Sequence, residues 1–243
     1  MLTLVPIANR LLSALPPAQY QCLELHLDIV HLSFGEVLYE VDAPIVYAYF
    51  PNDSLISLLT QVDDHRALEV GMVGAEGMLG ATLALGGQLS PVRALVQGAG
   101  TAMRLKATVF QREFKRGLSM QRSTLLYANA LMSQIAQTAA CNRFHDLEAR
   151  LARWLLMTRD RVGSNHFYLT QDFLSAMLGV RRVGVSNAAN ALKVRHVIDY
   201  SRGNIEIVDG VGLEALACSC YSKVEDRLEH NNVSLCSASN IDI

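Results

Sequence analysis

Residues 170–193, TQDFLSAMLGVRRVGVSNAANALK, carry the side chains of this sequence that are best suited to recognising the edges of nucleic-acid bases. Arginine can span the two acceptors of guanine, asparagine can pair with the donor and acceptor of adenine, and valine can contact the methyl group of thymine. Arg182, Val183 and Asn187 supply these three chemistries close together. We therefore predict that these three residues contact bases.

The same stretch has two faces when it is drawn as a helix with about 100° per residue. The first face is apolar and consists of Val185, Ala188, Ala189 and Leu192. The second face consists of Arg182, Val183 and three short polar residues, Ser186, Asn187 and Asn190. A face that is merely solvated usually carries Glu and Lys, and this face carries neither before Lys193. The pattern favours a recognition helix, and a solvated amphipathic helix is the alternative.

A second helix and a turn are expected to hold the recognition helix. Thr170 is suited to an N-cap, Asp172 to the positive end of a helix, and Gly179 to a tight turn. Two short helices joined by a glycine turn indicate a helix-turn-helix motif. Residues expected to meet phosphate oxygens are Gln171, Ser186 and Lys193, and Arg181 and Asn190 complete the predicted interface.

A β-hairpin is predicted directly after the recognition helix, in HVIDYSRGNIEIVD. Two short β-type runs flank Ser201-Arg202-Gly203-Asn204, which is a turn-forming tetrad. A hairpin in this position is the wing of a winged helix, and Arg202 at its tip would meet the DNA backbone or the minor groove.

Charge is distributed unevenly along the 243 residues. The net charge is −7 over residues 1–100, +8 over residues 101–210 and −3 over residues 211–243. The basic segment contains the predicted recognition helix, so this distribution favours a polyanionic partner for the middle of the chain.

The front of the chain is predicted to be an antiparallel β-barrel or sandwich that follows short helices in residues 9–27. HLSFGEVLYE, IVYAYFPND, SLISLLTQV, ALEVGMVG and VRALVQGAGTAMRL are short runs separated by turn residues, with no room for long helices between them. Residues 118–142 then lack Gly and Pro and repeat apolar or small residues at heptad spacing. The predicted dimer seam consists of Leu118, Leu125, Ala128, Met132, Ile135 and Ala139. Packing of this helix against the chain's own β domain is the alternative.

The order of these elements resembles the cyclic-AMP receptor protein/FNR (Crp/Fnr) family of bacterial transcription regulators. The resemblance covers roughly residues 9–222 and is strongest in HDLEARLARWLL, LTQDFLSAMLGVRRVGVS and YSRGNIEIVD. It implies an α+β protein with an N-terminal cyclic-nucleotide-binding-like β-roll (jelly-roll), a long dimerisation helix and a C-terminal winged helix-turn-helix. The implied domains are residues 1–142, including the dimerisation helix at about 118–142, and 143–222, followed by a polar tail, 223–243, with no assigned role.

The resemblance also implies partners. It implies a cytoplasmic homodimer on a near-palindromic double-stranded DNA operator, with RNA polymerase as a candidate further partner and no membrane association. Arg182 matches the family's recognition-helix arginine, whereas Val183 stands in place of a common glutamate and Asn187 in place of a second arginine. The operator is therefore expected to differ from that of the family's namesake.

The candidate effector cassette is GAEGMLGATLALGGQLSPVRALV, and its pocket residues would be Glu76, Gly77, Met78, Arg93 and Ala94. A cyclic phosphate needs backbone N–H donors and an opposed arginine. Arg93 lies one residue late relative to the family's cyclic-AMP pattern, and one step along a strand moves a side chain to the other face. We therefore expect no cofactor, and the alternatives to cyclic AMP are a different, unidentified small effector or a degenerate pocket that binds none.

Five cysteines, at positions 22, 141, 218, 220 and 236, do not form a disulfide pattern, which fits a reducing compartment. Cys218 and Cys220 are close together, but no second pair accompanies them, so we expect no metal. An iron–sulfur cluster would need grouped cysteines in the front domain. A haem ligand among His26, His31 and His65 stays open.

Three classes of function therefore compete. The favoured class is a dimeric DNA-binding regulator, which is not an enzyme. The second is a small-ligand or cyclic-nucleotide sensor whose helical C-terminus binds a protein partner, and salt-dependent DNA binding separates the two. The third, a cupin-like enzyme, would need grouped His and carboxylate ligands, and only His65 and Glu69 are close in the sequence.

Overall fold

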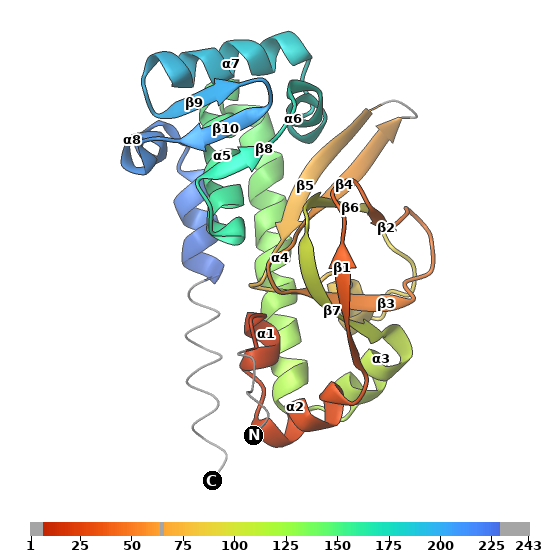
Figure 1. Ribbon diagram of the computed structural model, residues 1–243. Coiled ribbons are helices and arrows are strands. Elements are labelled where there is room, and N and C mark those ends of the chain that lie inside the picture. Colours follow the sequence, from red (N-terminus) through yellow and green to blue (C-terminus); the bar gives the residue numbers. More distant parts are fainter. Residues whose placement is uncertain (1–6, 64–65, 229–243) are drawn as a thin grey trace. The chain divides into compact units, whose positions relative to one another are not determined.

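The computed structural model in Figure 1 describes residues 7–63 and 66–228 of the chain. The chain divides into two compact units. Unit 1 comprises Met1–Leu58, Met72–Met132 and Arg227–Ile243, and unit 2 comprises Leu59–Gly71 and Ser133–Asp226. The long helix α4 (Leu118–Phe144) therefore contributes its first half to unit 1 and its second half to unit 2.

Seven strands build the front of the chain, and each predicted run overlaps at least one of them. The strands are β1 (Leu27–Leu32), β2 (Val37–Tyr39), β3 (Tyr47–Pro51), β4 (Leu55–Asp63), β5 (Arg66–Val73), β6 (Arg93–Gly98) and β7 (Gly100–Lys106). They form one sheet of order β1-β7-β3 and a second sheet of order β2-β6-β4-β5. β7 pairs antiparallel with β1 and β3, and β6 pairs antiparallel with β2. The predicted antiparallel β architecture is confirmed.

Short helices accompany these strands. They are α1 (Arg10–Ser13), α2 (Pro17–Glu24), the 3-10 helix η1 (Ala81–Leu85) and α3 (Ala107–Lys115). Asn9 is buried and caps α1, because its Oδ1 accepts hydrogen bonds from the backbone N–H groups of Leu11 and Leu12. Its Nδ2 donates to the carbonyls of Pro51 and Gly77, so one side chain joins α1 to the end of β3 and to the loop after β5.

Helix α4 begins at Leu118 and ends at Phe144, close to the predicted range. Of the six predicted seam residues, Leu125, Met132 and Ala139 are exposed, Ile135 is half-buried and Ala128 is buried within the chain. The position of the Leu118 side chain lies outside what the structure describes. A stripe of exposed residues recurs with alternating steps of three and four residues, and it consists of Arg122, Leu125, Asn129, Met132, Ala136, Ala139 and Arg143.

Unit 2 contains the predicted winged helix-turn-helix. Its elements are α5 (Leu147–Val162), β8 (His166–Tyr168), α6 (Gln171–Leu178), α7 (Arg182–Val194), β9 (Ile198–Ser201), β10 (Asn204–Ile207) and α8 (Gly210–Leu216). The three strands form an antiparallel sheet of order β8-β10-β9. Leu151, Leu155, Leu174, Val185 and Leu192 are fully or almost fully buried and join α5, α6 and α7 in one core.

After α8 the chain turns and is helical again over residues 220–228, where Val224 and Leu228 are buried. The first residues of the predicted polar tail, 223–228, are therefore part of this helix, and residues 229–243 lie outside the described residues. Among the described helices, none has the length and apolar character needed to span a membrane.

Candidate nucleic-acid interface

The turn between α6 and α7 forms as the sequence predicted. Thr170 caps α6, because its Oγ1 accepts a hydrogen bond from the backbone N–H of Phe173 at 3.1 Å. Gly179 ends α6 with φ of +62°, a left-handed conformation that glycine adopts at little cost. The backbone N–H of Val180 donates to the carbonyl of Ser175, which satisfies a carbonyl at the end of the helix. These contacts fix the point from which α7 begins.

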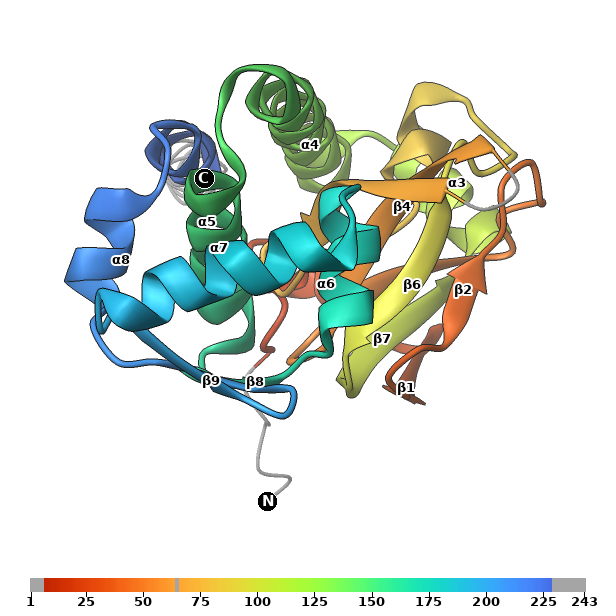
Figure 2. The same cartoon turned by 90° about the horizontal axis from the view of Figure 1, so that it is seen from above.

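Helix α7 buries the predicted apolar face and exposes the predicted recognition face. Val185, Ala188, Ala189 and Leu192 are buried. Of the residues predicted to contact DNA on or beside α7, Arg181, Arg182, Val183, Asn187, Asn190 and Lys193 are exposed, and Ser186 is half-buried. Val183 exposes 63% of its surface, which is a large exposed apolar area beside an arginine. Figure 2 shows α7 lying across α5, with α6 beside its N-terminal half.

Gln171 on α6 orients the start of the recognition face. Its Oε1 accepts one hydrogen bond from Arg182 Nε at 3.3 Å and another from Ser186 Oγ at 2.8 Å. Asp172 Oδ1 lies 3.5 Å from the same Arg182 nitrogen. The Arg182 guanidinium is thus held by its Nε side. The two terminal nitrogens of the guanidinium take part in neither contact.

Lys193, near the end of α7, connects the recognition helix to the wing. Its Nζ lies 2.6 Å from Asp199 Oδ1 and donates to the carbonyl of Tyr200 at 3.2 Å. The hydrogen bond and the positive charge of Lys193 lower the pKa of the Asp199 carboxyl group. About half of each side chain is exposed, so water screens this ion pair and its contribution to stability is small.

The predicted wing is a two-residue hairpin between β9 and β10. Its central residues Arg202 and Gly203 have φ of +49° and +87°, and two positive φ angles are what a type I′ hairpin turn requires. Arg202 is exposed at the tip. Strand β8, which was not predicted, pairs with β10 and makes the wing three-stranded.

Gly184 lies inside α7, where glycine is unfavourable by up to about 1 kcal/mol relative to alanine. The structure gives it a packing role. A Cβ atom at this position would lie 3.0 Å from Cδ2 of Leu147, the first residue of α5. Because glycine has no side chain, α5 and α7 approach closely without a break in the recognition helix.

Two residues of β5 contact the helix-turn-helix within unit 2. Trp154 Nε1 on α5 donates to Glu69 Oε1 at 2.8 Å, and both residues are buried. A Cβ atom added to Gly179 would lie 2.7 Å from Cδ1 of Leu68. Strand β5 therefore touches both the core helix and the turn that sets the position of α7.

Comparison with known proteins agrees with this geometry. The family model of the Crp-like helix-turn-helix domain matches residues 149–216. This chain carries a Crp-like helix-turn-helix domain. No curated protein matches the chain.

Solved structures resemble the chain over most of its length. FixK2 from Bradyrhizobium japonicum has a TM-score of 0.68 and 14% identity, covering 79% of this chain and 98% of its own. A CRP-family transcriptional regulator from Thermus thermophilus has a TM-score of 0.64 and 17% identity, covering 77% and 96%. The c-di-GMP-responsive global regulator CLP from Xanthomonas campestris has a TM-score of 0.63 and 15% identity, covering 79% and 99%. The predicted fold and the predicted resemblance to DNA-binding regulators of the Crp/Fnr type are confirmed.

Within the candidate effector cassette, some of the predicted pocket residues are buried and Arg93 is exposed to solvent. Glu76, Met78 and Ala94 are buried, and the Glu76 carboxylate accepts a hydrogen bond from the backbone N–H of Gly74 at 3.1 Å. The Tyr127 ring of α4 occupies the space that a side chain on Gly77 would need. Arg93 is exposed and its Nε lies 3.3 Å from Glu40 Oε2. Arg93 and Ala94 thus point to opposite faces of β6, as the strand period requires.

Two of the three histidines considered as haem ligands lie in the described part of the chain. His26 and His31 are exposed, and Arg112 Nη2 lies 3.2 Å from His26 Nε2. His65 lies outside the described residues. Glu69, the carboxylate considered for a cupin-like site, is the hydrogen-bond acceptor of Trp154 described above.

Proposed function

We propose that the protein is a homodimeric transcription regulator whose two Crp-like domains bind a near-palindromic operator. One observation carries this proposal. Helix α7 exposes Arg182, Val183 and Asn187 together, and Gln171 accepts a hydrogen bond from Arg182 Nε. In helix-turn-helix motifs, residues at the start of the second helix contact base edges. A cytoplasmic regulator without enzymatic activity, with RNA polymerase as a further partner, follows as part of the same proposal.

Contacts divide into two kinds. Arg182, Val183 and Asn187 read bases, because they are exposed and offer a bidentate donor, a methyl contact and an amide. Four residues meet phosphates and set the position of α7: Gln171, Ser186, Lys193 and Arg202. Arg181, directly before the helix, and Asn190, one turn beyond Asn187, extend the same exposed surface.

Dimerisation is proposed to use the exposed stripe of α4. Its steps of three and four residues give the 3.5-residue repeat of a coiled-coil seam. Leu125 and Met132 supply exposed apolar side chains at alternate positions, and Asn129 lies between them. A polar residue at a single seam position specifies register. The small Ala136 and Ala139 let two helices approach closely.

Gating by a small effector other than cyclic AMP completes the proposal. The outward ion pair between Arg93 and Glu40 supports the exclusion of cyclic AMP. The contacts of Leu68 and Glu69 with the Crp-like domain offer a route by which a shift of β5 would move Gly179 or Trp154. Effector and operator affinities would then be coupled through one element.

Selection of bound sites from random duplex DNA tests the reading function. Purified protein, with and without the small-molecule fraction of a cell extract, is expected to enrich a symmetric consensus whose half-sites lie about 10 base pairs apart. Binding should weaken steeply as salt rises, because phosphate contacts release counterions. Absence of any sequence preference under both conditions contradicts the proposal, as does binding that does not change with salt.

Sedimentation of Met132→Asp tests the dimer. Each protomer would then place an unpaired carboxylate in the buried dimer seam. The dimer should therefore dissociate to monomers and lose its affinity for the full operator. Ile29→Asp is the control, because Ile29 is equally exposed but lies on β1. If both variants remain dimeric, the seam does not follow α4.

A further inference from the structure

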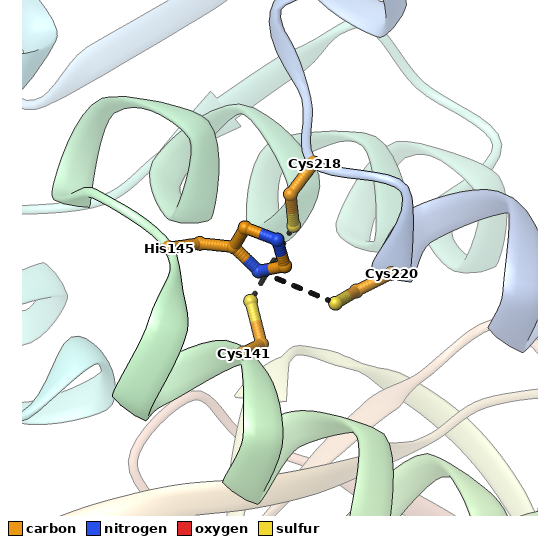
Figure 3. Close-up of side chains that lie close together, drawn as sticks. All are labelled: Cys141, His145, Cys218 and Cys220. Atoms are coloured by element: carbon orange, nitrogen blue, oxygen red, sulfur yellow. Dashed lines mark hydrogen bonds between the residues drawn. The ribbon is translucent and has the colours of Figure 1, made fainter.

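Four potential metal ligands lie together in unit 2, and none of them is among the residues predicted to contact DNA. Cys141 and His145 are one helical turn apart at the end of α4, and Cys218 and Cys220 follow α8. Figure 3 shows the four side chains pointing toward one another from these two segments. Their ligand atoms all lie within 4.8 Å of one another. Cys141 Sγ is 3.4 Å from Cys218 Sγ, and Cys220 Sγ is 3.5 Å from His145 Nδ1.

We propose that Cys141, His145, Cys218 and Cys220 bind a structural Zn²⁺ ion. Three thiolates and one imidazole form a ligand set that closed, structural zinc sites use. Zinc–sulfur bonds of about 2.3 Å in a tetrahedron place neighbouring sulfur atoms about 3.8 Å apart. The Cys141–Cys218 sulfur separation of 3.4 Å is close to this value, and all four ligand atoms lie within 4.8 Å of one another, so side-chain movements of about 1 Å suffice to complete the tetrahedron. Four protein ligands leave no open position, so the ion is structural and not catalytic.

The surroundings of the cluster favour an anion at its centre. All three cysteines are buried, and Gln137 Nε2 donates to Cys220 Sγ at 3.0 Å. Arg153 is only 6% exposed and acts electrostatically on Cys141. Within the described part of the chain, its side chain donates to Thr138 and forms no ion pair with a carboxylate. Zn²⁺ with three thiolates and a neutral histidine carries a charge of −1, which would compensate this buried guanidinium.

Two simpler explanations account for less of this arrangement. Buried free cysteines often act as small apolar residues. That explanation covers the three thiols but not the histidine nitrogen beside Cys220 or the amide donor aimed at its sulfur. A disulfide between Cys141 and Cys218 would use the shortest sulfur–sulfur approach but would leave Cys220 and His145 without a role.

The ligands bracket the Crp-like domain in the sequence. Cys141 and His145 precede the matched residues 149–216, and Cys218 and Cys220 follow them. A bound ion would therefore tie the first and last segments of the domain together and add its binding free energy to the stability of the fold. This inference does not depend on the proposed DNA-binding function, because the ion can be measured without DNA.

Metal analysis of the full-length protein tests the site directly. Protein purified under reducing conditions without chelators should contain one zinc ion per chain. Replacement of zinc by Co²⁺ should give the intense visible bands and the sulfur-to-cobalt charge-transfer absorption of tetrahedral thiolate coordination. Removal of the metal should lower the unfolding temperature, and added Zn²⁺ should restore it.

Variants assign the ligands. Cys141→Ser and Cys220→Ser should each lose stoichiometric zinc and the cobalt spectrum, whereas Cys22→Ser, at an exposed cysteine of α2, should retain both. Gln137→Ala should keep the spectrum but bind zinc about 10-fold more weakly, since it removes only the hydrogen bond to a ligand.

Several outcomes overturn the proposal. They are wild-type protein that holds neither zinc nor cobalt after reconstitution, a Cys141–Cys218 disulfide in the freshly purified native protein, and iron with labile sulfide in place of zinc. Equal zinc content in Cys22→Ser and Cys220→Ser also contradicts it. If a ligand variant fails to fold, the metal content and cobalt spectrum of the wild-type protein still decide the question.

Discussion

Arg182 and Arg93 were both singled out from the sequence, and the structure treats them in opposite ways. Arg182 begins a helix whose inner face is buried, and Gln171 and Asp172 hold it beside an exposed valine. Arg93 begins a strand and pairs with Glu40 on the outer face, while Glu76 of the same cassette is buried. Arg182 belongs to an exposed helix surface that is open to a macromolecular partner. Arg93 belongs to a solvent-exposed ion pair.

The difference teaches how much a local pattern decides. On α7, function requires only that one face of a single helix be exposed, and helical periodicity alone fixes that face. In the cassette, function requires Arg93 and Glu76 to converge from separate segments, and a displacement of one residue along a strand is enough to separate them. Four predictions test this contrast, from the largest expected effect to the smallest.

Arg182→Ala should abolish selective operator binding while nonspecific binding survives. Loss of a bidentate base contact costs about 1–3 kcal/mol of discrimination per half-site, and the dimer has two half-sites. Competition between the selected operator and scrambled duplex measures the effect. Arg112→Ala, which changes an exposed arginine of α3, is the matched control. If Arg182→Ala kept full preference for the operator, Arg182 would not contact bases and would not differ from Arg93 in this respect.

Gly179→Ala should destabilise the protein more than Gly163→Ala. Both glycines end helices with positive φ, so each alanine costs about 1–2 kcal/mol of backbone strain. Only the Cβ at position 179 also meets another residue, Leu68, whereas nothing lies within 4 Å of the Cβ at position 163. Denaturant unfolding measures both. The additional loss of unfolding free energy in Gly179→Ala should disappear when Leu68 is also replaced by alanine. Equal losses in Gly179→Ala and Gly163→Ala would mean that β5 does not contact the turn.

Lys193→Ala should weaken binding to operator and scrambled DNA by similar factors. Lys193 is proposed to contact phosphate, so its loss should reduce the slope of log affinity against log salt by about one per half-site. Binding isotherms across a salt series give this slope. A change in the preferred sequence, with the slope unaltered, would instead make Lys193 a base-reading residue.

Arg93→Ala should leave ligand binding unchanged, because its side chain faces outward toward Glu40. Calorimetric titration with cyclic AMP should give no saturable heat for the wild type or for the variant. Saturable binding by the wild type that Arg93→Ala removes would return Arg93 to the effector pocket and erase the contrast.

Much of the fold follows from local patterns. The strand runs, the α4 range, the Thr170 cap, the Gly179 turn and the wing hairpin each depend on residues close in the sequence, and each forms as predicted. Strand β8 was missed because it has only three residues and is stabilised by pairing with the distant β10. Helix α3 was missed because it directly follows β7 without a turn signal.

Long-range proximity could not be derived in the same way. Cys141 and His145, the ligand pair that comes first in the chain, had a local signal in their spacing of four residues across the end of a predicted helix. Its meaning depends on Cys218 and Cys220, which the whole Crp-like domain separates from this pair. Along α4, the heptad pattern assigned Leu125 and Met132 to a dimer seam, and both are exposed in the single chain. The burial of Ala128, in contrast, depends on neighbours that the helix sequence does not reveal.

The order of the cluster along the chain sets an order of events during synthesis. Cys141 and His145 leave the ribosome before any part of the Crp-like domain, and Cys218 and Cys220 leave after all of it. Two ligands alone hold a metal weakly. The proposed four-ligand zinc site can therefore form only after the recognition helix and the wing have been synthesised. Translation that stops before residue 218 would yield a Crp-like domain with every residue proposed to contact DNA but without two of the four proposed zinc ligands.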